Sequence, residues 1–292
     1  MTLEGTNTYL VFGGRQAIAI DPGPIGRGHS DAILAAASSR GATIAAILLT
    51  HDHPDHAPGA AMLRERSGAA VYAHAGSRFD ADHRIGEGER IVIGDAELEV
   101  LETPGHARDH LVFSLAEEAA LFTGDVVIGR GTVVIAPPHG DMRAYQASLE
   151  RLRREHEDTR TLYGGHGEAI DDPRAKLDEY IAHRKSREAE ILAALAAGER
   201  TVPELVAEIY RAIPTILWPA AARQIVAYLI ALEREHRVQS RLLQRPPRSD
   251  EAAILNPDLS RIADPASAAV ARAELGFDDP AVSVVGYSLT PG

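Results

Sequence analysis

The chain has 292 residues, 45% of them hydrophobic and 25% charged, proportions typical of a soluble globular protein with one large domain and a smaller one. A formal net charge of −12 predicts weak nonspecific attraction to nucleic acid. It does not exclude a local basic face. The absence of cysteine excludes disulfides and thiolate ligands, so any metal must be bound through nitrogen and oxygen. We expect no membrane span, because no apolar run looks long enough, and a cytoplasmic location, because residues 1–10 lack a basic segment and an apolar signal core.

The first half of the chain predicts alternating strands and helices. Residues 6–12 and 16–20 predict a β-hairpin around two glycines. Ser30 is the expected cap of a helix over 30–39, and a strand over 45–50 follows. Further along we expect helices at 60–67 and 143–156 and strands at 70–73, 89–93, 97–102, 111–115 and 119–122.

Residues 50–56 hold three histidines and two acids directly after an apolar run. Alternate residues of an extended segment point to the same side, so His51 and His53 can share one cation. A proline then turns the chain, and Asp55 and His56 follow where they can face a second, neighbouring cation. A solvated polar loop is the alternative, but groups of this polarity packed against an apolar run need partners.

The spacing His-x-His-x-Asp-His after a hydrophobic strand and a threonine resembles the metallo-β-lactamase superfamily of binuclear metal hydrolases. The resemblance implies an α/β fold, a four-layer αββα sandwich. His106, in a Pro-Gly turn after the strand at 97–102, would complete a three-nitrogen set with His51 and His53. By resemblance Asp125 bridges both metals, although a Gly-Asp after a strand is otherwise only a turn. The implied ligands are His51, His53 and His106 for one cation, Asp55, His56 and His166 for the other, and Asp125 between them.

Other polar residues near this set are expected to have supporting roles or none. By the same resemblance Asp21 supports the metal site from behind its ligands, and a plain turn residue is equally consistent with the sequence. His110 is expected to support the ligands rather than to bind metal, and His74 to be structural. His139, on a proline-rich loop, is a candidate for substrate contact or proton transfer, with an exposed histidine of no role as the alternative. Gly164 stands where relatives usually have proline, which would loosen the last ligand loop.

The second half of the chain predicts three further helices. We expect them at 178–197, 201–211 and 219–235, the second opened by a capping box from Thr201 and Glu204. Their order resembles the winged-helix-like segment of the β-lactamase-like protein 2 group, whose studied members include an endoribonuclease. The third helix would read a nucleic-acid groove in such a domain, but its arginines are offset by glutamates, which favours packing or dimerisation. The expected domains are a metal-hydrolase domain at 1–190, a winged-helix-like helical domain at 191–243, and a linker and tail at 244–292.

The two ends of the chain predict that a late strand covers an open sheet edge. By resemblance, one more strand would precede residues 5–10, and its absence leaves an edge unpaired. Residues 244–265 read as a linker, 266–275 as a short helix and 281–289 as a strand. We expect this last strand to pair with the open edge, in the same chain or in a partner.

These features predict a binuclear, zinc-dependent hydrolase. Two cations about 3.5–4 Å apart would lower the pKa of a bridging water, and the resulting hydroxide, oriented by Asp55 and Asp125, would attack the substrate. The favoured substrate is a small acyl compound, an ester, thioester or lactone, as for glyoxalase II-like relatives. The alternatives are a metal-dependent endoribonuclease on single-stranded RNA, which the acidic charge disfavours, and then a β-lactamase or a non-catalytic binding module. The donor set suits two Zn²⁺ best and would accept iron or manganese, and a homodimer is left open.

Overall fold

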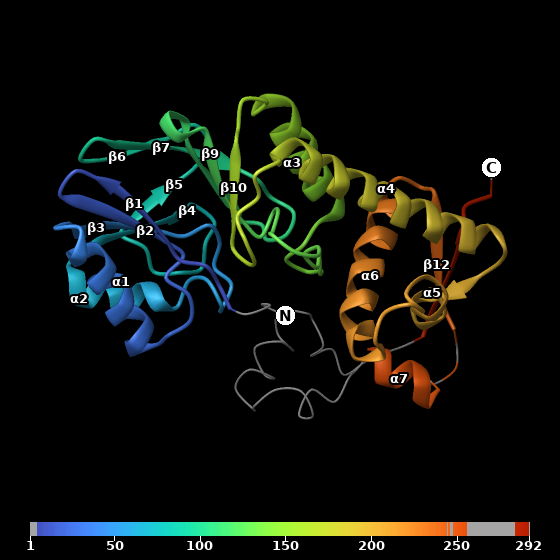
Figure 1. The fold of residues 1–292 in the computed structure, drawn as a ribbon. Coiled ribbons are helices and arrows are strands. Elements are labelled where there is room, and N and C mark those ends of the chain that lie inside the picture. The colour runs from blue at the N-terminus through green and yellow to red at the C-terminus, as the bar shows by residue number, and fades with distance from the viewer. Residues whose placement is uncertain (1–4, 244, 246–247, 256–283, 292) are drawn as a thin grey trace. The chain divides into compact units, whose positions relative to one another are not determined.

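The computed structural model describes residues 5–243, 245, 248–255 and 284–291 (Figure 1). The chain divides into two compact units, and each is described by itself. The first unit comprises Met1–Val133 and Ala144–Tyr180, and the second comprises Val134–Arg143 and Ile181–Gly292. The long helix α4, Pro173–Ala196, begins in the first unit and continues into the second. The expected domain borders after residues 190 and 243 remain predictions.

Two five-stranded sheets form the first unit. The order of one sheet is β1-β2-β3-β4-β5 and that of the other is β10-β9-β8-β7-β6. The strands of the first sheet are β1 Tyr9–Gly13, β2 Gln16–Ile20, β3 Thr43–Leu48, β4 Ala70–His74 and β5 His83–Ile85. Those of the second are β6 Arg90–Ile93, β7 Ala96–Glu102, β8 Leu111–Leu115, β9 Ala120–Gly124 and β10 Thr161–Gly164. Strands β2 to β5 are parallel, as are β9 and β10, and the remaining pairs are antiparallel.

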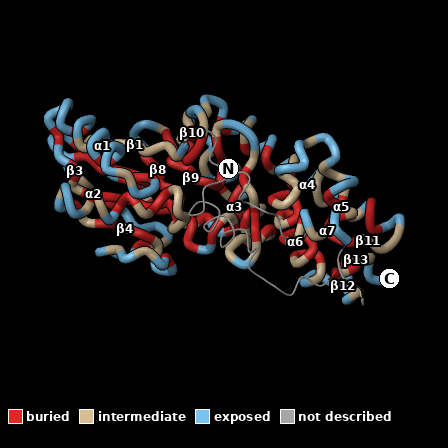
Figure 2. The backbone as a smooth tube through the Cα atoms, turned by 90° about the horizontal axis from the view of Figure 1, so that it is seen from below, coloured by how far each residue is buried: buried red, intermediate tan, exposed pale blue. Residues whose placement is uncertain are grey.

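The alternation of side chains along β2 explains how the layers pack. Ile18 belongs to the apolar cluster between the two sheets, which also contains Phe113 of β8. Ala17 and Ala19 face the other way, into a cluster that contains Leu63 of α2, because successive strand residues point to opposite faces. The helices are α1 Arg27–Ser39, α2 Gly59–Ser67 and α3 Met142–Glu155. Figure 2 shows the buried backbone concentrated in the strands, and Figure 1 shows α3 on the side of β9 and β10. The expected α/β fold is confirmed.

Most expected elements of this unit agree with the structure to within two residues. Three starts do not: β1 begins at Tyr9 and not at residue 6, α1 at Arg27 and not at residue 30, and α4 at Pro173 and not at residue 178. Helix α2 was expected one residue later than its true start, and it ends at Gly68, whose φ of 73° is in the left-handed region. Ser30 is wrong as a cap, because α1 begins at Arg27 and Ser30 makes no capping bond. Its side chain lies on the inward stripe of the helix with Ile33, so the buried face and not the hydroxyl determines where this residue sits.

The carboxyl ends of the parallel strands place polar loops at one edge of the sheets. In the first sheet, β2 is followed by Asp21 and β3 by residues 50–56. In the second, β9 is followed by Asp125 and β10 by a glycine and His166. The N–H of Leu111 donates to the carbonyl oxygen of Thr50 at 2.7 Å, which ties the two edges together. This edge is where ligands bind in open α/β sheets.

The second unit combines helices with a small antiparallel sheet of order β11-β13-β12. Its further elements are β11 Arg200–Thr201, α5 Val202–Ile209, α6 Trp218–Arg234, β12 Val238–Leu242, α7 Ser249–Leu255 and β13 Val285–Leu289. The expected capping box of α5 is confirmed: the N–H of Thr201 donates to Oε2 of Glu204 at 2.8 Å, and the N–H of Glu204 donates to Oγ1 of Thr201 at 3.4 Å. Helix α6 lies within one residue of its expected bounds.

The prediction for the last strand is wrong. Strand β13 does not cover the edge of the first sheet, because it pairs with β11 and β12 on its two sides. Tyr287 lies opposite both Arg200 and Ser240, so the backbone groups of β13 are already used on both edges. Residues 281–283 and the expected helix at 266–275 lie outside the described residues. The expected linker also contains a helix, α7, in which Glu251 accepts hydrogen bonds from Arg245.

Helix α6 corrects one expectation about apolar runs. Together with the preceding turn, Thr215–Arg234 is long and apolar enough to cross a membrane by length and composition, and more than half of its most apolar window is buried. Tyr228, Leu229 and Leu232 are fully buried, as in the core helix of a folded domain. At the end of the helix, Arg234 pairs with Asp141 at 2.7 Å, so its charge is already compensated.

Candidate metal centre

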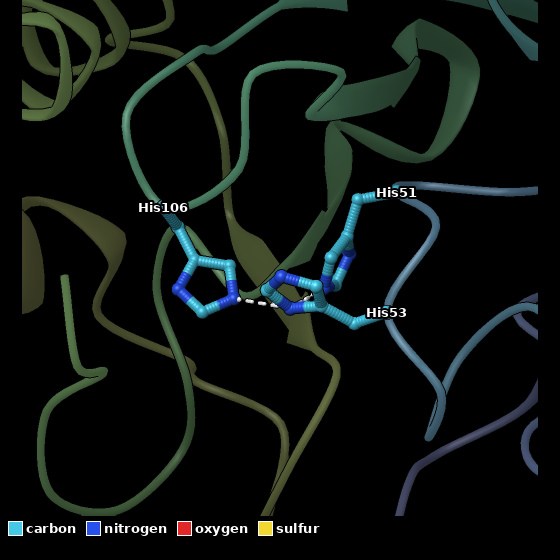
Figure 3. A group of neighbouring side chains, drawn as sticks. All are labelled: His51, His53 and His106. Atoms are coloured by element: carbon cyan, nitrogen blue, oxygen red, sulfur yellow. Dashed lines mark hydrogen bonds between the residues drawn. The ribbon is translucent and has the colours of Figure 1, made fainter. Parts of the chain in front are cut away.

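Three imidazole rings turn toward one another at the edge of the first sheet (Figure 3). Nδ1 of His53 lies 3.0 Å from Nε2 of His51 and 3.0 Å from Nε2 of His106. His51 and His53 follow β3 two residues apart, and His106 comes from the loop after β7. A ring nitrogen carries at most one hydrogen, so three nitrogens at this spacing cannot all be satisfied by one another. Their lone pairs converge where a cation would be bound.

A second donor group lies beside the first and is joined to it by Asp125. Oδ2 of Asp55 lies 3.7 Å from Nε2 of His56 and 3.3 Å from Nε2 of His166. Oδ1 of Asp125 lies 3.5 Å from Nε2 of His56, and Oδ2 lies 3.7 Å from Nε2 of His106 and 3.4 Å from Nε2 of His166. Three overlapping groups of donor atoms result, and together they contain every expected ligand: His51, His53, Asp55, His56, His106, Asp125 and His166.

Asp21 and Thr50 determine which nitrogen two of these histidines present. The carboxylate of Asp21 accepts hydrogen bonds from the N–H of Thr50 at 2.8 Å and from its hydroxyl at 2.6 Å. Because that hydroxyl hydrogen is used, Oγ1 of Thr50 accepts from Nδ1 of His51 at 3.0 Å. Nδ1 of His56 donates to Oδ2 of Asp21 at 2.8 Å. Both rings therefore keep Nε2 for the centre, and Asp21 lies behind the ligands as expected.

His110 and Gly5 hold two other members of the set. The N–H of Asp125 donates to Nε2 of His110 at 3.0 Å, so Nδ1 of His110 carries the hydrogen and donates to Oγ1 of Thr103 at 2.8 Å. Both ring nitrogens of His110 are thus used in holding the backbone of Asp125. Nδ1 of His166 donates to the carbonyl oxygen of Gly5 at 2.9 Å, which leaves Nε2 of His166 facing the carboxylates.

Two buried polar atoms show that the cluster fits a metal. Nε2 of His56 and Oδ1 of Asp125 are buried and make no hydrogen bond within the described part of the chain. Leaving a buried polar atom unsatisfied costs about 1–3 kcal/mol, and a cation would satisfy both. The backbone also makes room here, because a Cβ on Gly165 would lie 2.6 Å from Oδ1 of Asp125 and from Cε1 of His56. The nitrogen and oxygen donors suit Zn²⁺ and would accept iron or manganese.

Comparison with known proteins decides the family. Residues 1–166, more than half of the chain, match the model of the Metallo-beta-lactamase superfamily. The chain belongs to the metallo-β-lactamase superfamily. Residues 201–242 match the Beta-lactamase associated winged helix domain, so the expected winged-helix domain is confirmed as well. Family and donor set together identify a metal-dependent hydrolase.

Similar proteins cover most of this superfamily chain. A lactamase-like protein, adaB, of Aspergillus niger is 34% identical over 255 residues, 82% of this chain and 78% of its own length. A beta-lactamase-like protein 2 homolog of Drosophila melanogaster is 32% identical over 82% of this chain and 86% of its own length. The crystal structure of a metallo-beta-lactamase family protein from Thermus thermophilus has a TM-score of 0.67 and 24% identity, covering 81% of this chain and 91% of that one. This structure supports the fold alone.

Burial keeps two imidazoles of the first donor group neutral. Burial lowers the pKa of His51 well below its usual range, and the neighbouring imidazoles, His56 first, lower it further. Burial and the adjacent His106 lower the pKa of His53 to about 3. A neutral imidazole is the form that binds a metal, so His51 and His53 are ready for a cation without losing protons.

The carboxylates have the opposite effect on the second donor group. Burial lowers the pKa of His56, but Asp125 and Asp21 outweigh it and raise that pKa well above the usual range. Burial likewise opposes charge on His166, while hydrogen bonds to Asp125 and Asp55 raise its pKa to about 10. Both rings therefore carry a proton near neutral pH when no metal is bound, and each must lose that proton to become a ligand.

Two further histidines of the sequence analysis lie outside the donor groups. His139 belongs to the segment Val134–Arg143, which is grouped with the second unit, and it is in none of the donor groups found among the described residues. Its role in substrate contact or proton transfer remains a prediction. Nδ1 of His74 accepts from the N–H of Gly76 at 2.9 Å, and its Nε2 lies 3.2 Å from Oε1 of Glu102, the structural role expected of it.

The sequence analysis missed two groups of supporting contacts. Asp52, between the first two ligands, accepts from the N–H and Nε of Arg78 at 2.8 and 2.9 Å and fastens the ligand stretch to the loop after β4. Alternation along the chain predicts that Asp52 points away from its neighbours, but nothing in the spacing indicates Arg78. The second group joins Asn7 and Tyr9 to the loop of His166.

Proposed function

We propose that this protein is a binuclear zinc hydrolase that cleaves small acyl substrates, thioesters first among them. The observation that carries the proposal of two ions is the position of Asp125. Its Oδ2 lies 3.7 Å from Nε2 of His106 and 3.4 Å from Nε2 of His166, so one carboxylate reaches the donors of both groups. A carboxylate shared in this way is what a closely spaced pair of cations needs.

Bound zinc ions would supply Lewis acidity, which lowers the pKa of a coordinated water and polarises the carbonyl of the substrate. The side chains of the protein would hold the geometry. Asp125 is the more enclosed of the two carboxylates, with a side chain 10% exposed, and it faces both donor groups. Asp55 is 27% exposed and lies on the open side, where the carboxylate oxygen that is not used as a ligand is suited to orient the attacking water. The oxygen of the substrate carbonyl would enter from that same side.

The chemistry of the leaving group favours a thioester. All seven residues of the set are committed to ligand positions, so none of them is available as an acid for the leaving group. A thiol has a pKa of about 8.5 and leaves as a thiolate without an acid. The release of an alkoxide would demand a proton from elsewhere, and for that role the sequence offers His139 as the candidate.

Two named relatives support the same substrate class. Proteins of Passalora fulva and Aspergillus chevalieri, named atrochrysone carboxyl ACP thioesterases, are 34% and 35% identical over 72% and 73% of this chain. The matches cover 64% and 70% of those two proteins. We therefore propose that this protein also cleaves a thioester bond. The proposal does not extend to the acyl group named for either relative.

Single-stranded RNA is the second candidate substrate, and it rests on the winged-helix match. Phosphate recognition draws on free arginines and lysines, whereas the net charge here is −12 and Arg237, after α6, pairs with Glu188 at 2.7 Å. The acyl substrate is therefore preferred. A homodimer and a cytoplasmic location also remain proposals, to be tested by light scattering and by fractionation of cells.

The proposal is tested by assaying the purified protein against thioesters, esters, lactones and labelled single-stranded RNA, each with and without a chelator. We expect two equivalents of zinc and chelator-sensitive thioester cleavage. The variants D125A and H56A should lose bound metal and hydrolysis together. RNA cleavage at low enzyme concentration with no acyl turnover would overturn the substrate, and a single tightly bound equivalent would overturn the pair of ions.

A further inference from the structure

The segment Gly5–Tyr9 is fastened to the loop that carries His166. The backbone N–H of Asn7 donates to the carbonyl oxygen of Gly165 at 2.7 Å. The side-chain amide of Asn7 donates to the carbonyl oxygens of Gly164 at 3.0 Å and Gly167 at 2.7 Å. One side chain therefore binds the backbone on both sides of the histidine.

Tyr9 completes this arrangement. Its hydroxyl donates to the carbonyl oxygen of Gly164 at 2.7 Å and lies 3.0 Å from Nδ2 of Asn7. At the other end of the segment, the carbonyl oxygen of Gly5 accepts from Nδ1 of His166 at 2.9 Å. The carbonyl oxygen of Gly164 is thus held by two side chains, and whether glycine loosens the loop relative to proline stays a prediction.

Apart from His166, the loop Gly164–Gly167 has no side chain that could hold it, because its glycines are required by close contacts. A Cβ at Gly164 would lie 2.8 Å from the carbonyl oxygen of Val127, and one at Gly165 would touch Asp125 and His56. Gly167 has a φ of 79°, in the left-handed region. Backbone bonds from Gly165 to Gly124 and from Gly129 to His166, both 2.8 Å, hold the loop in part. A glycine-rich backbone loses more conformational entropy on ordering than other backbone does. Additional hydrogen bonds therefore have their greatest effect on the order of such a loop.

We infer that Asn7 is a positioning residue whose amide holds the loop Gly164–Gly167 and thereby aims Nε2 of His166 at the second cation. The inference rests on the two-cation site proposed above. Asn7 contacts neither metal nor substrate in this scheme and acts through His166 alone. Loss of its two donors frees carbonyl oxygens on both sides of the ligand, and the removal of such supporting contacts typically costs 10–100-fold in metal affinity.

Two substitutions separate hydrogen bonding from packing. N7A removes the amide, while N7D keeps the size of the side chain and places an accepting carboxylate against two carbonyl oxygens. The variant Q239A is the matched control, because it deletes an amide that donates to Oγ of Ser288 at 3.2 Å in the second unit. Y9F is a further variant that removes the hydroxyl alone, and with it the contacts to Gly164 and to Nδ2 of Asn7.

Binding of the two zinc equivalents is measured by competition with a chromophoric chelator. In N7A and N7D we expect one equivalent to lose at least about tenfold in affinity while the other is unchanged, with N7D no better than N7A. Y9F should show a smaller loss of the same kind, and Q239A none. Unchanged binding in both Asn7 variants, or an equal loss of both equivalents, would overturn the inference, as would N7D binding zinc like the parent protein.

A second readout does not depend on the number of ions. Hydrogen exchange of peptides covering residues 160–170 is measured in the metal-free protein, where N7A, N7D and Y9F should exchange faster than the parent or Q239A. If the parent protein binds only one cation, the two-ion proposal fails while this measurement still tests the hold on the loop. Equal exchange in all of these proteins would refute the positioning role, whatever the metal content.

Discussion

Oδ2 of Asp21 and Nδ1 of His56 are 2.8 Å apart, and both residues are almost completely buried. The contact fixes the tautomer of His56 and points its Nε2 into the centre. Asp21 should therefore increase the affinity for metal without being a ligand. We expect D21N to weaken the second zinc equivalent by about 10–100-fold. The control is D31N, an exposed acid on α1 paired with Arg66, which should leave zinc binding unchanged. Equal affinity in D21N and the parent protein would contradict this role.

Metal binding should release protons from the second donor group. Without metal, the pKa of His56 is raised well above its usual range and that of His166 to about 10, because carboxylates surround both rings. Both are protonated at pH 7 to 8, so occupation of the site releases about two protons. Protons compete with the metal below these pKa values, and affinity should therefore rise with pH, by up to about tenfold per proton for each unit. Calorimetry in buffers of different ionisation enthalpy measures the release, and heats that are the same in all buffers would argue against it.

Gly165 should tolerate no side chain. A Cβ at this position would lie 2.6 Å from Oδ1 of Asp125 and Cε1 of His56, both of which are buried and cannot retreat. We expect G165A to fold less stably and to lose the second zinc equivalent. G28A is the control, because a Cβ there meets nothing within 4 Å and the residue lies in helix α1, where alanine should add up to about 1 kcal/mol of stability. A G165A protein that binds two equivalents normally would show that the ligands have more room than these contacts indicate.

Acid should destabilise the second unit through Glu188. Burial opposes ionisation of this carboxylate, but hydrogen bonds from Arg143 and Arg237 outweigh it and lower its pKa. A carboxylate with a lowered folded-state pKa contributes stability above its unfolded pKa of about 4.3, and that contribution is lost as the pH falls further. At pH 7 we expect the free energy of unfolding of E188Q to be about 1–3 kcal/mol lower than that of the parent protein. This difference should disappear near pH 3.

The control for Glu188 is E190Q. Glu190 is more exposed and pairs with Arg187 three residues away, so its replacement should cost less than about 1 kcal/mol at any pH. Urea unfolding of the three proteins at pH 7 and pH 3 makes the comparison. A deficit of E188Q that persists unchanged at pH 3 would mean that packing, and not the charge, is lost.

Much of the centre could be predicted because it depends on local chain geometry. His51 and His53 meet His106 because alternate residues leaving a strand share a side, and Asp125 and His166 follow parallel strands that end at the same edge. Spacing alone reveals the pairing of His51 with His53, whereas the family resemblance implied the role of Asp125 and completed the ligand set. The contacts that hold the set together are different, since Asn7 meets Gly164 across 157 positions and no periodicity links them.

The wrong predictions have a common physical origin, because each concerned the partner of an element and that partner is distant in the sequence. The strand character of residues 285–289 was visible in the sequence, but any unpaired edge could have accepted that strand, and the structure pairs it with β11 and β12. Ser30 has the chemistry of a cap, yet its place on the buried stripe of α1 is decided by what the helix packs against. Local propensity identifies an element, whereas its partners depend on the whole fold.

Strand β13 occupies the middle of its sheet, with β11 on one side and β12 on the other. A protein shortened after residue 242, where the family match ends, would lack this middle strand and leave both neighbours with bare backbone edges. Such a product would be prone to self-association through those edges. Residues 285–289 therefore complete a sheet whose other two strands lie at the two ends of the winged-helix match, however far along the chain they are encoded.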